Sequence, residues 1–185
     1  NYILDLKKIK GENVFPHYPG SGILQSNFFS NIKNKNISSI QPFANKALST
    51  VVHCNEYGVW KSFETDEMGF NNPIQQEFDG NNYSISLIGD SFTEGFCHGN
   101  DEDIGSLLRQ KNLNVVNFGK TGGLTFYEAI YREYIKEDKV IDSDYVVMNI
   151  FFVNDVLDTY DEQNSQILSQ YKDDDNFTQK LFEKN

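Results

Sequence analysis

From residue 83 onward the sequence alternates short apolar segments with amphipathic ones, and this alternation constrains the fold more than any other feature. Residues 83–88, 115–118 and 145–152 have the length and composition of buried strands. Residues 101–110, 124–136 and 161–171 are predicted to form helices. Strands that alternate with helices build right-handed βαβ units, so we predict an α/β domain with a parallel sheet. The nearly continuous apolar run 145–152 is typical of a strand that is covered on both faces.

Residues 1–80 have a different character. Gly and Pro punctuate them, and residues 31–39 are polar and rich in Asn. Two β-branched runs, 49–53 and 59–63, flank a turn-forming stretch at 55–58, which predicts a small hairpin. We therefore divide the chain into an irregular N-terminal region with some β structure, residues 1–80, and an α/β domain, residues 81–185. The sequence leaves open whether the first region folds separately or packs onto the sheet.

Composition excludes several classes of partner. The 185 residues carry a formal net charge of −11, so the basic footprint of a nucleic-acid-binding protein is absent. No apolar run is long enough to span a bilayer, and we expect no membrane insertion by this segment. Because the first residue is Asn1 and not Met, the lack of a signal peptide does not exclude one upstream.

The two cysteines, Cys54 and Cys97, are too few for a disulfide scaffold. They form either one structural disulfide, as in an exported protein, or two buried thiols, and the sequence does not decide between these. Neither belongs to a Cys-x-x-Cys pair, so a metal site built on them is not expected.

Chemically useful residues follow each predicted strand. Ser91 follows the first, a glycine-containing loop from Asn117 to Gly123 follows the second, and Asn154 follows the third. In a parallel α/β sheet, ligands bind outside the carboxyl ends of the strands, so these loops are expected to meet at one crevice. A hydroxyl, backbone N–H groups beside glycines and a side-chain amide are the components of a serine nucleophile and its oxyanion hole.

In this order and spacing the motifs resemble the SGNH/GDSL hydrolase family. Gly89-Asp90-Ser91 is similar to the family's first block, Asn117-x-Gly119-x-x-Gly122 to the second and Asn154-Asp155 to the third. The resemblance covers roughly residues 83–157, and Gly69-Phe70-Asn71-Asn72-Pro73 is similar to a lead-in found in many bacterial relatives. It implies a flavodoxin-like parallel sheet. Those relatives are often exported or attached to membranes and are associated with surface polysaccharides.

The resemblance also implies a role for each residue of the site. Ser91 would be the nucleophile, and the Ser91 N–H, the Gly122 N–H and the Asn154 amide would hold the oxyanion. Asp90 would shape the nucleophile turn, and Asp155 would support Asn154. The implied activity is hydrolysis or transfer of an acyl group, with an O-acetyl ester on a small molecule or polysaccharide as substrate. No metal or organic cofactor is implied. An exported location, periplasmic or in the cell envelope, is expected, with the cytoplasm as the alternative.

The chain departs from the family in two places. The third block usually reads Gly-x-Asn-Asp, whereas here Phe152 and Val153 precede Asn154. The family's final Asp-x-x-His block, which supplies the base, is missing, because the three histidines are His17, His53 and His98. The family sheet usually has five strands, and three are predicted here. We expect a domain that is incomplete at its C-terminal side, with a degenerate family member as the alternative.

Other interpretations compete with an active esterase. The chain could be a catalytically inactive SGNH-like binding or assembly protein in a surface-polysaccharide pathway. A phosphate-binding module that uses residues 119–123 ranks below it, because the P-loop pattern is absent. Locally, Ser91 could simply cap a helix, Gly122 and Gly123 could be turn glycines, and Asn154 could be an N-cap. His98 follows the nucleophile on the same connection and is the remaining candidate for a substitute base.

Overall fold

The computed structural model describes residues 2–18, 40–56, 58–75, 82–136 and 140–181. The Asn-rich stretch at 31–39 and the boundary expected between residues 80 and 81 lie outside these ranges. The N-terminal part begins with helix α1 (Tyr2–Lys10) and forms a sheet in the order β1-β2-β3. Strands β2 (Thr50–Cys54) and β3 (Lys61–Glu64) pair antiparallel, which confirms the predicted hairpin. Strand β1 (Val14–Pro16) pairs parallel to β2.

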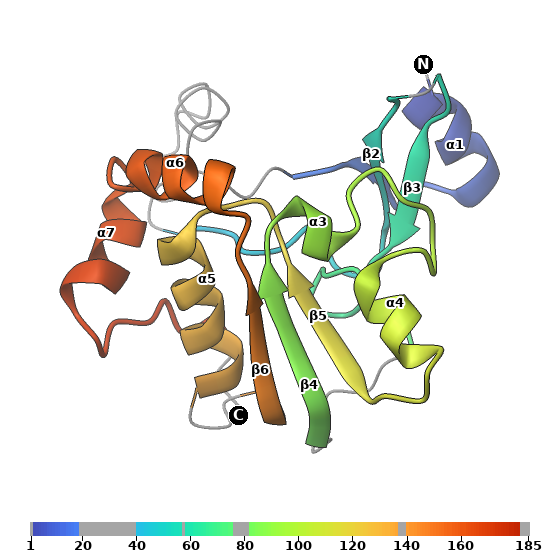
Figure 1. The fold of residues 1–185 in the computed structure, drawn as a ribbon. Coiled ribbons are helices and arrows are strands. Elements are labelled where there is room, and N and C mark those ends of the chain that lie inside the picture. Colours follow the sequence, from blue (N-terminus) through green and yellow to red (C-terminus); the bar gives the residue numbers. More distant parts are fainter. Residues whose placement is uncertain (1, 19–39, 57, 76–81, 137–139, 182–185) are drawn as a thin grey trace.

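The second part is an α/β unit built on three parallel strands. These are β4 (Asn82–Gly89), β5 (Val115–Gly119) and β6 (Asp142–Asn149), in the order β5-β4-β6 (Figure 1). The predicted α/β class with a parallel sheet is confirmed. The helices of this part are α3 (Ser91–Glu94), α4 (Ile104–Arg109), α5 (Leu124–Ile130), α6 (Phe152–Glu162) and α7 (Gln166–Asp173), and α5 continues into a π-helical turn, η2 (Tyr131–Ile135).

The predicted helix boundaries need correction. Helix α4 begins at Ile104 rather than 101, because the Asp103 carboxylate caps it by accepting a hydrogen bond from the Ser106 N–H at 3.0 Å. The helix predicted at 161–171 is two helices, since α6 ends at Glu162 and Ser165 caps α7. The helix predicted at 124–136 is α-helical only as far as Ile130.

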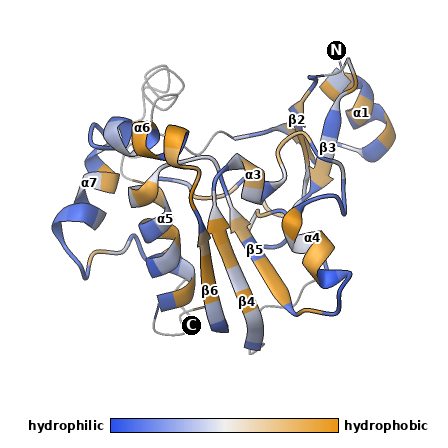
Figure 2. Ribbon diagram, in the orientation of Figure 1, coloured by the Kyte–Doolittle hydropathy of each residue, from blue (hydrophilic) through white to orange (hydrophobic). Residues whose placement is uncertain are grey.

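The third strand was predicted with the wrong end and the wrong environment. Strand β6 ends at Asn149, and Phe152 already begins α6. Most residues of β6 are exposed, including Tyr145 at 69% and Val147 at 39%, although coverage on both faces was expected. The reason is position: β6 is an edge of the sheet, and no further strand among the described residues pairs with its outer side. Figure 2 shows that apolar residues form the later part of β6 and the start of α6.

One hydrophobic core joins the two parts of the chain. Phe70 from the N-terminal part contacts Phe118 of β5 and Tyr134 of η2, with ring centroids 5.0 and 5.3 Å apart. Phe43 likewise lies 5.0 Å from Phe126 of α5. The described N-terminal segments therefore pack onto the sheet.

Hydrogen bonds also connect the two parts of the chain, and they come from the stretch Gly69-Phe70-Asn71-Asn72-Pro73. The Asn72 side chain accepts from the Asn117 N–H at 2.8 Å and donates to the Asn117 carbonyl at 2.9 Å, so it pairs with β5 as a neighbouring strand would. Asn71 donates to the Glu94 carbonyl at 2.8 Å. Both residues therefore position the elements around the first two strand ends.

Among the residues that the structure describes, there is no helix with the length and apolar character needed to cross a bilayer.

Candidate functional site

The three strands of the α/β part end at the same level. Gly89, the last residue of β4, is in register with Gly119 of β5 on one side and Asn149 of β6 on the other. The Lys120 N–H donates to the Gly89 carbonyl at 2.7 Å, which keeps the second loop against the end of β4. The chain segments that carry Ser91, Gly122 and Asn154 therefore leave from one edge, as predicted.

Ser91 is the first residue of α3 and is half-buried. Asp90 is the N-cap of that helix, and its Oδ1 accepts a hydrogen bond from the Phe92 N–H at 3.0 Å. The alternative in which Ser91 caps the helix is therefore wrong. The Ser91 hydroxyl has no hydrogen-bond partner among the described residues. Asp90 shapes the turn, as the resemblance implied, and leaves the serine side chain available.

The two glycines of the second loop have different roles. A Cβ on Gly123 would lie 2.3 Å from the Thr159 backbone nitrogen, so helix α6 approaches too closely for any side chain. The Gly123 N–H also donates to Glu162 at 2.5 Å. A Cβ on Gly122 would meet the Phe126 ring at 2.7 Å, and the Gly122 N–H has no partner within the described chain. Gly123 is structural, whereas Gly122 keeps a free backbone donor.

Asn154 is the third residue of α6 rather than part of a loop. Its Nδ2 donates weakly to Asp158 at 3.5 Å, and its Oδ1 is buried without a partner. Asp155 is fully buried, and its Oδ2 accepts from the Phe151 N–H at 2.8 Å. Asp155 thus fixes the start of α6, and it supports Asn154 through that helix rather than through a direct hydrogen bond.

Two buried side-chain oxygens at this edge, Asp90 Oδ2 and Asn154 Oδ1, have no hydrogen-bond partner among the described residues. The Tyr127 hydroxyl and the Asp155 carboxylate lie close enough to interact with each other. Buried polar groups are nearly always hydrogen-bonded in native structures, so the two oxygens without a partner are candidate acceptors for a ligand. Burial raises the pKa of Asp90, and burial together with the Asp90 charge raises the pKa of Asp155. Burial also raises the pKa of Glu162 to about 7.

A pocket of about 300 Å³ opens between the ends of β4 and β6; it is lined by Asp90, Phe92, Thr93, Ile104, Asn149, Ile150 and Phe151. The chain leaves β4 toward β5 on one side and later returns to β6 on the other. Crevices that bind ligands form where the strand order of a parallel sheet reverses in this way. The residues on both sides of Ser91 line this pocket. A second hollow, of about 260 Å³, lies around Arg109, whose guanidinium is already bonded to Asn72, Ser106 and Val115.

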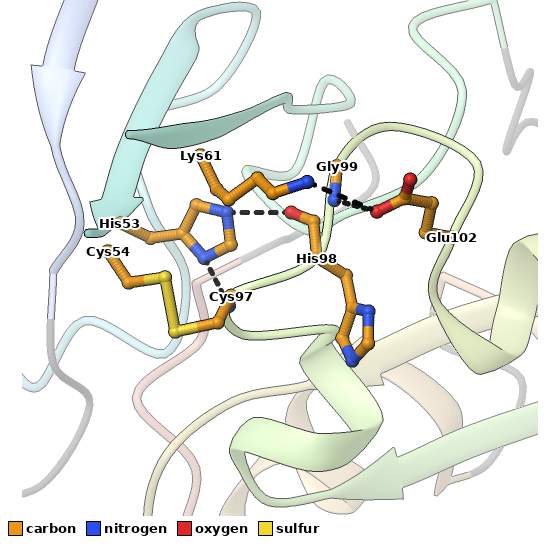
Figure 3. Close-up of a disulfide and its surroundings, with 7 residues drawn as sticks. All are labelled: His53, Cys54, Lys61, Cys97, His98, Gly99 and Glu102. Carbon is orange, nitrogen blue, oxygen red and sulfur yellow. Dashed lines mark hydrogen bonds and ion pairs between the residues drawn. A yellow bond between two sulfur atoms is a disulfide. The ribbon is translucent and has the colours of Figure 1, made fainter. Parts of the chain in front are cut away.

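None of the three histidines hydrogen-bonds to Ser91. His17 Nε2 lies 2.9 Å from Glu94 and 2.9 Å from Lys120 Nζ. His53 donates from Nε2 to the His98 carbonyl and accepts at Nδ1 from the Cys97 N–H. The His98 imidazole has no hydrogen-bond partner in the described part of the chain, and it points away from the disulfide in Figure 3. His98 therefore gains no support as a substitute base.

A buried ion cluster that the sequence did not indicate lies behind the site. Lys120 Nζ lies 2.9 Å from the Glu94 carboxylate and 3.0 Å from Asn45 Oδ1. Burial lowers the pKa of Lys120, which the Glu94 charge opposes. Glu94 comes three positions after Ser91 in α3, so this cluster holds the turn at the start of α3 from its inner side.

The Cys54–Cys97 pair forms a disulfide (Figure 3), which decides between the two alternatives left open by the sequence. It ties β2 to the segment that follows α3. Within the described ranges, no group of three or more His, Cys, Asp or Glu side chains is arranged to hold a metal ion.

Comparison of the chain with protein-family models, with curated proteins and with solved structures finds no match.

Proposed function

We propose that the chain is an SGNH/GDSL-type serine esterase domain that acts on O-acyl esters of carbohydrates, with O-acetyl as the acyl group. The observation that carries the proposal is the placement of Ser91. It stands at the aligned carboxyl edge of the sheet, and Asp90 caps α3 in its place, so the serine hydroxyl is unpaired. The strand order β5-β4-β6 supports it, because it agrees with the first three strands of the flavodoxin-like order 2-1-3-4-5.

In the proposed reaction, Ser91 Oγ bonds to the carbonyl carbon while a base removes the hydroxyl proton, and the carbonyl oxygen becomes the oxyanion. The intermediate collapses by breaking the ester C–O bond, and the proton passes from the base to the departing sugar hydroxyl. Water then attacks the acyl-enzyme, which releases acetate and restores Ser91. The Ser91 and Gly122 N–H groups are unpaired donors for the oxyanion. Asn154 Nδ2 makes only a weak 3.5 Å contact with Asp158, which it can exchange for a hydrogen bond to the oxyanion. Removing one such donor typically costs on the order of a hundredfold to a thousandfold in turnover. The proton acceptor is not one of the three histidines in their observed positions, so full turnover requires another base.

The placement of the histidines favours a second candidate, a catalytically inactive SGNH-like protein that binds a surface polysaccharide. In either case the Cys54–Cys97 disulfide supports an exported location, because disulfides persist in oxidising compartments.

Hydrolysis of 4-nitrophenyl acetate and of an acetylated oligosaccharide tests the proposal. Ser91→Ala should reduce the rate to background, whereas Ser169→Ala, which removes a surface hydroxyl in α7, should not change it. Equal rates for wild type and Ser91→Ala, both above the uncatalysed background, would rule out the serine as nucleophile. Saccharide binding that persists in Ser91→Ala, with no hydrolysis by any variant, would favour the binding protein.

A further inference from the structure

The pocket between β4 and β6 combines apolar walls with one unused acceptor. Phe92 and Phe151 line it as an edge-to-face pair with centroids 5.4 Å apart, and the two residues are 69% and 47% exposed. Asn149 donates to Thr93 Oγ1 at 3.3 Å, so these two polar side chains partly satisfy each other. Asp90 is 2% exposed, and its Oδ2 is buried without a partner. A ligand that completes this pocket must bring a hydrogen-bond donor and an apolar surface.

The charges around the pocket favour a cation as that donor. The Asp155 and Asp158 carboxylates of α6 lie close enough to Asp90 to repel it, and residues 140–171 contain no Lys or Arg. Lys120, in the loop after β5, is fully buried and paired with Glu94. A buried carboxylate without a counter-charge is costly, and an anionic ligand would increase that cost. A metal ion fits poorly, since the lining is mostly apolar and the described residues hold no cluster of metal ligands.

We propose that this pocket binds a small organic ammonium ion, whose N–H groups donate to Asp90 Oδ2 and whose apolar part lies against Phe92 and Phe151. Hydrogen bonds between charged groups are shorter and stronger than neutral ones. Aromatic faces also attract cations. The inference goes beyond the proposed esterase activity and does not depend on it, because binding requires no reaction at Ser91.

Three probes of the same shape and different charge test the proposal: benzylammonium, benzyl alcohol and benzoate. Each is titrated into isotope-labelled protein at neutral pH and followed by amide chemical shifts. We expect benzylammonium to bind with a Kd of roughly 1 mM, as befits a fragment of this size. It should bind about tenfold tighter than benzyl alcohol. The shifted amides should belong to residues 90–93 and 149–151, and Ser91→Ala should bind as wild type does.

Matched variants assign the contacts. Asp90→Asn keeps a good N-cap for α3 and should weaken benzylammonium binding about tenfold. Asp144→Asn removes an equal charge from the exposed strand β6 and should leave the affinity within about twofold, since exposed charges are screened by salt. Phe151→Ala should weaken binding severalfold, whereas Phe152→Ala, on a neighbouring exposed ring outside the pocket, should not.

Benzyl alcohol binding as tightly as benzylammonium, with no effect of Asp90→Asn, would overturn the proposal in favour of a neutral hydroxyl site. Preferential binding of benzoate, or no shifts at residues 90–93 and 149–151, would also overturn it. Failure of the esterase assay would leave the result unaffected.

Discussion

The Lys120 ammonium lies 2.9 Å from the Glu94 carboxylate, and neither side chain reaches solvent. His17 and Asn45, both from the N-terminal part, complete the cluster by contacting Glu94 at 2.9 and 3.1 Å. Glu94 belongs to the helix that begins with Ser91, and Lys120 begins the loop that leads to Gly122. The N-terminal part therefore helps to position the two loops on which the proposed site depends.

Lys120→Met should destabilise the protein by about 3–5 kcal/mol, because it leaves the Glu94 charge buried and unpaired. Burial alone would raise the pKa of Glu94, but Lys120 and His17 outweigh burial and lower that pKa to about 2. The double variant Lys120→Met/Glu94→Gln should recover much of the loss. Urea unfolding followed by circular dichroism measures both, and a double variant no more stable than Lys120→Met would contradict the pairing.

His53 should make stability depend on pH. Burial lowers the pKa of His53 from 6.5 to about 4, and protonation at Nδ1 would break the bond from the Cys97 N–H. As the pH falls, the unfolded chain takes up the proton first. The contribution is therefore complete above pH 6.5 and is lost progressively toward pH 4, by about 3 kcal/mol.

In His53→Gln, the midpoint of urea unfolding should change less with pH across this window than it does in the wild type. His98→Gln is the matched control, because the His98 imidazole has no hydrogen-bond partner among the described residues. If the urea midpoint depends on pH as strongly in His53→Gln as in the wild type, other groups cause the pH dependence.

Reduction of the disulfide should lower the free energy of unfolding. Cys54 and Cys97 are 43 residues apart in sequence, and a bridge closing a loop of this size typically contributes about 2–4 kcal/mol. The urea midpoint of the wild type should fall in dithiothreitol, whereas that of Cys54→Ser/Cys97→Ser should not respond. A wild-type midpoint insensitive to the reductant would contradict the stabilising role.

Substitution of the two loop glycines should affect stability to different degrees. Gly123→Ala should destabilise by about 1–3 kcal/mol, because the Thr159 backbone cannot yield easily. A Cβ on Gly122 would lie 2.7–2.9 Å from side-chain atoms of the buried Phe126, including its Cβ. Gly122→Ala should therefore also destabilise the protein, but less than Gly123→Ala, because a side chain and not the backbone must move. Thermal unfolding of both variants measures the order, and the reverse order would show that Gly122 carries the tighter packing.

The sequence predicted the hairpin and the parallel sheet, because runs of apolar residues mark buried strands. The start of β5 at Val115 was predicted correctly, whereas β6 begins at Asp142 and not at residue 145, because its first residues are polar. The prediction also failed at the end of β6, where Ile150 and Phe151 continue the apolar run but leave the sheet. Composition cannot distinguish a covered apolar strand from an exposed edge. The prediction that Asn154 follows a strand directly failed for the same reason.

The positions of the candidate residues were predicted in part. Motif order placed Ser91 and Gly122 in segments that leave the same edge of the sheet, and the structure has them there. The ion cluster could not be predicted, because His17 and Lys120 are 103 residues apart and nothing local marks a lysine as buried. The orphaned Asp90 Oδ2 likewise depends on tertiary neighbours and not on the Gly-Asp-Ser motif itself.

Reaction with a fluorophosphonate probe, read by intact mass and peptide mapping, tests most directly whether Ser91 is an activated nucleophile. We expect one covalent adduct, located at Ser91, that is absent from Ser91→Ala and retained in Ser169→Ala. Labelling that survives in Ser91→Ala, or no labelling of the wild type, would contradict the assignment of Ser91 as an activated nucleophile.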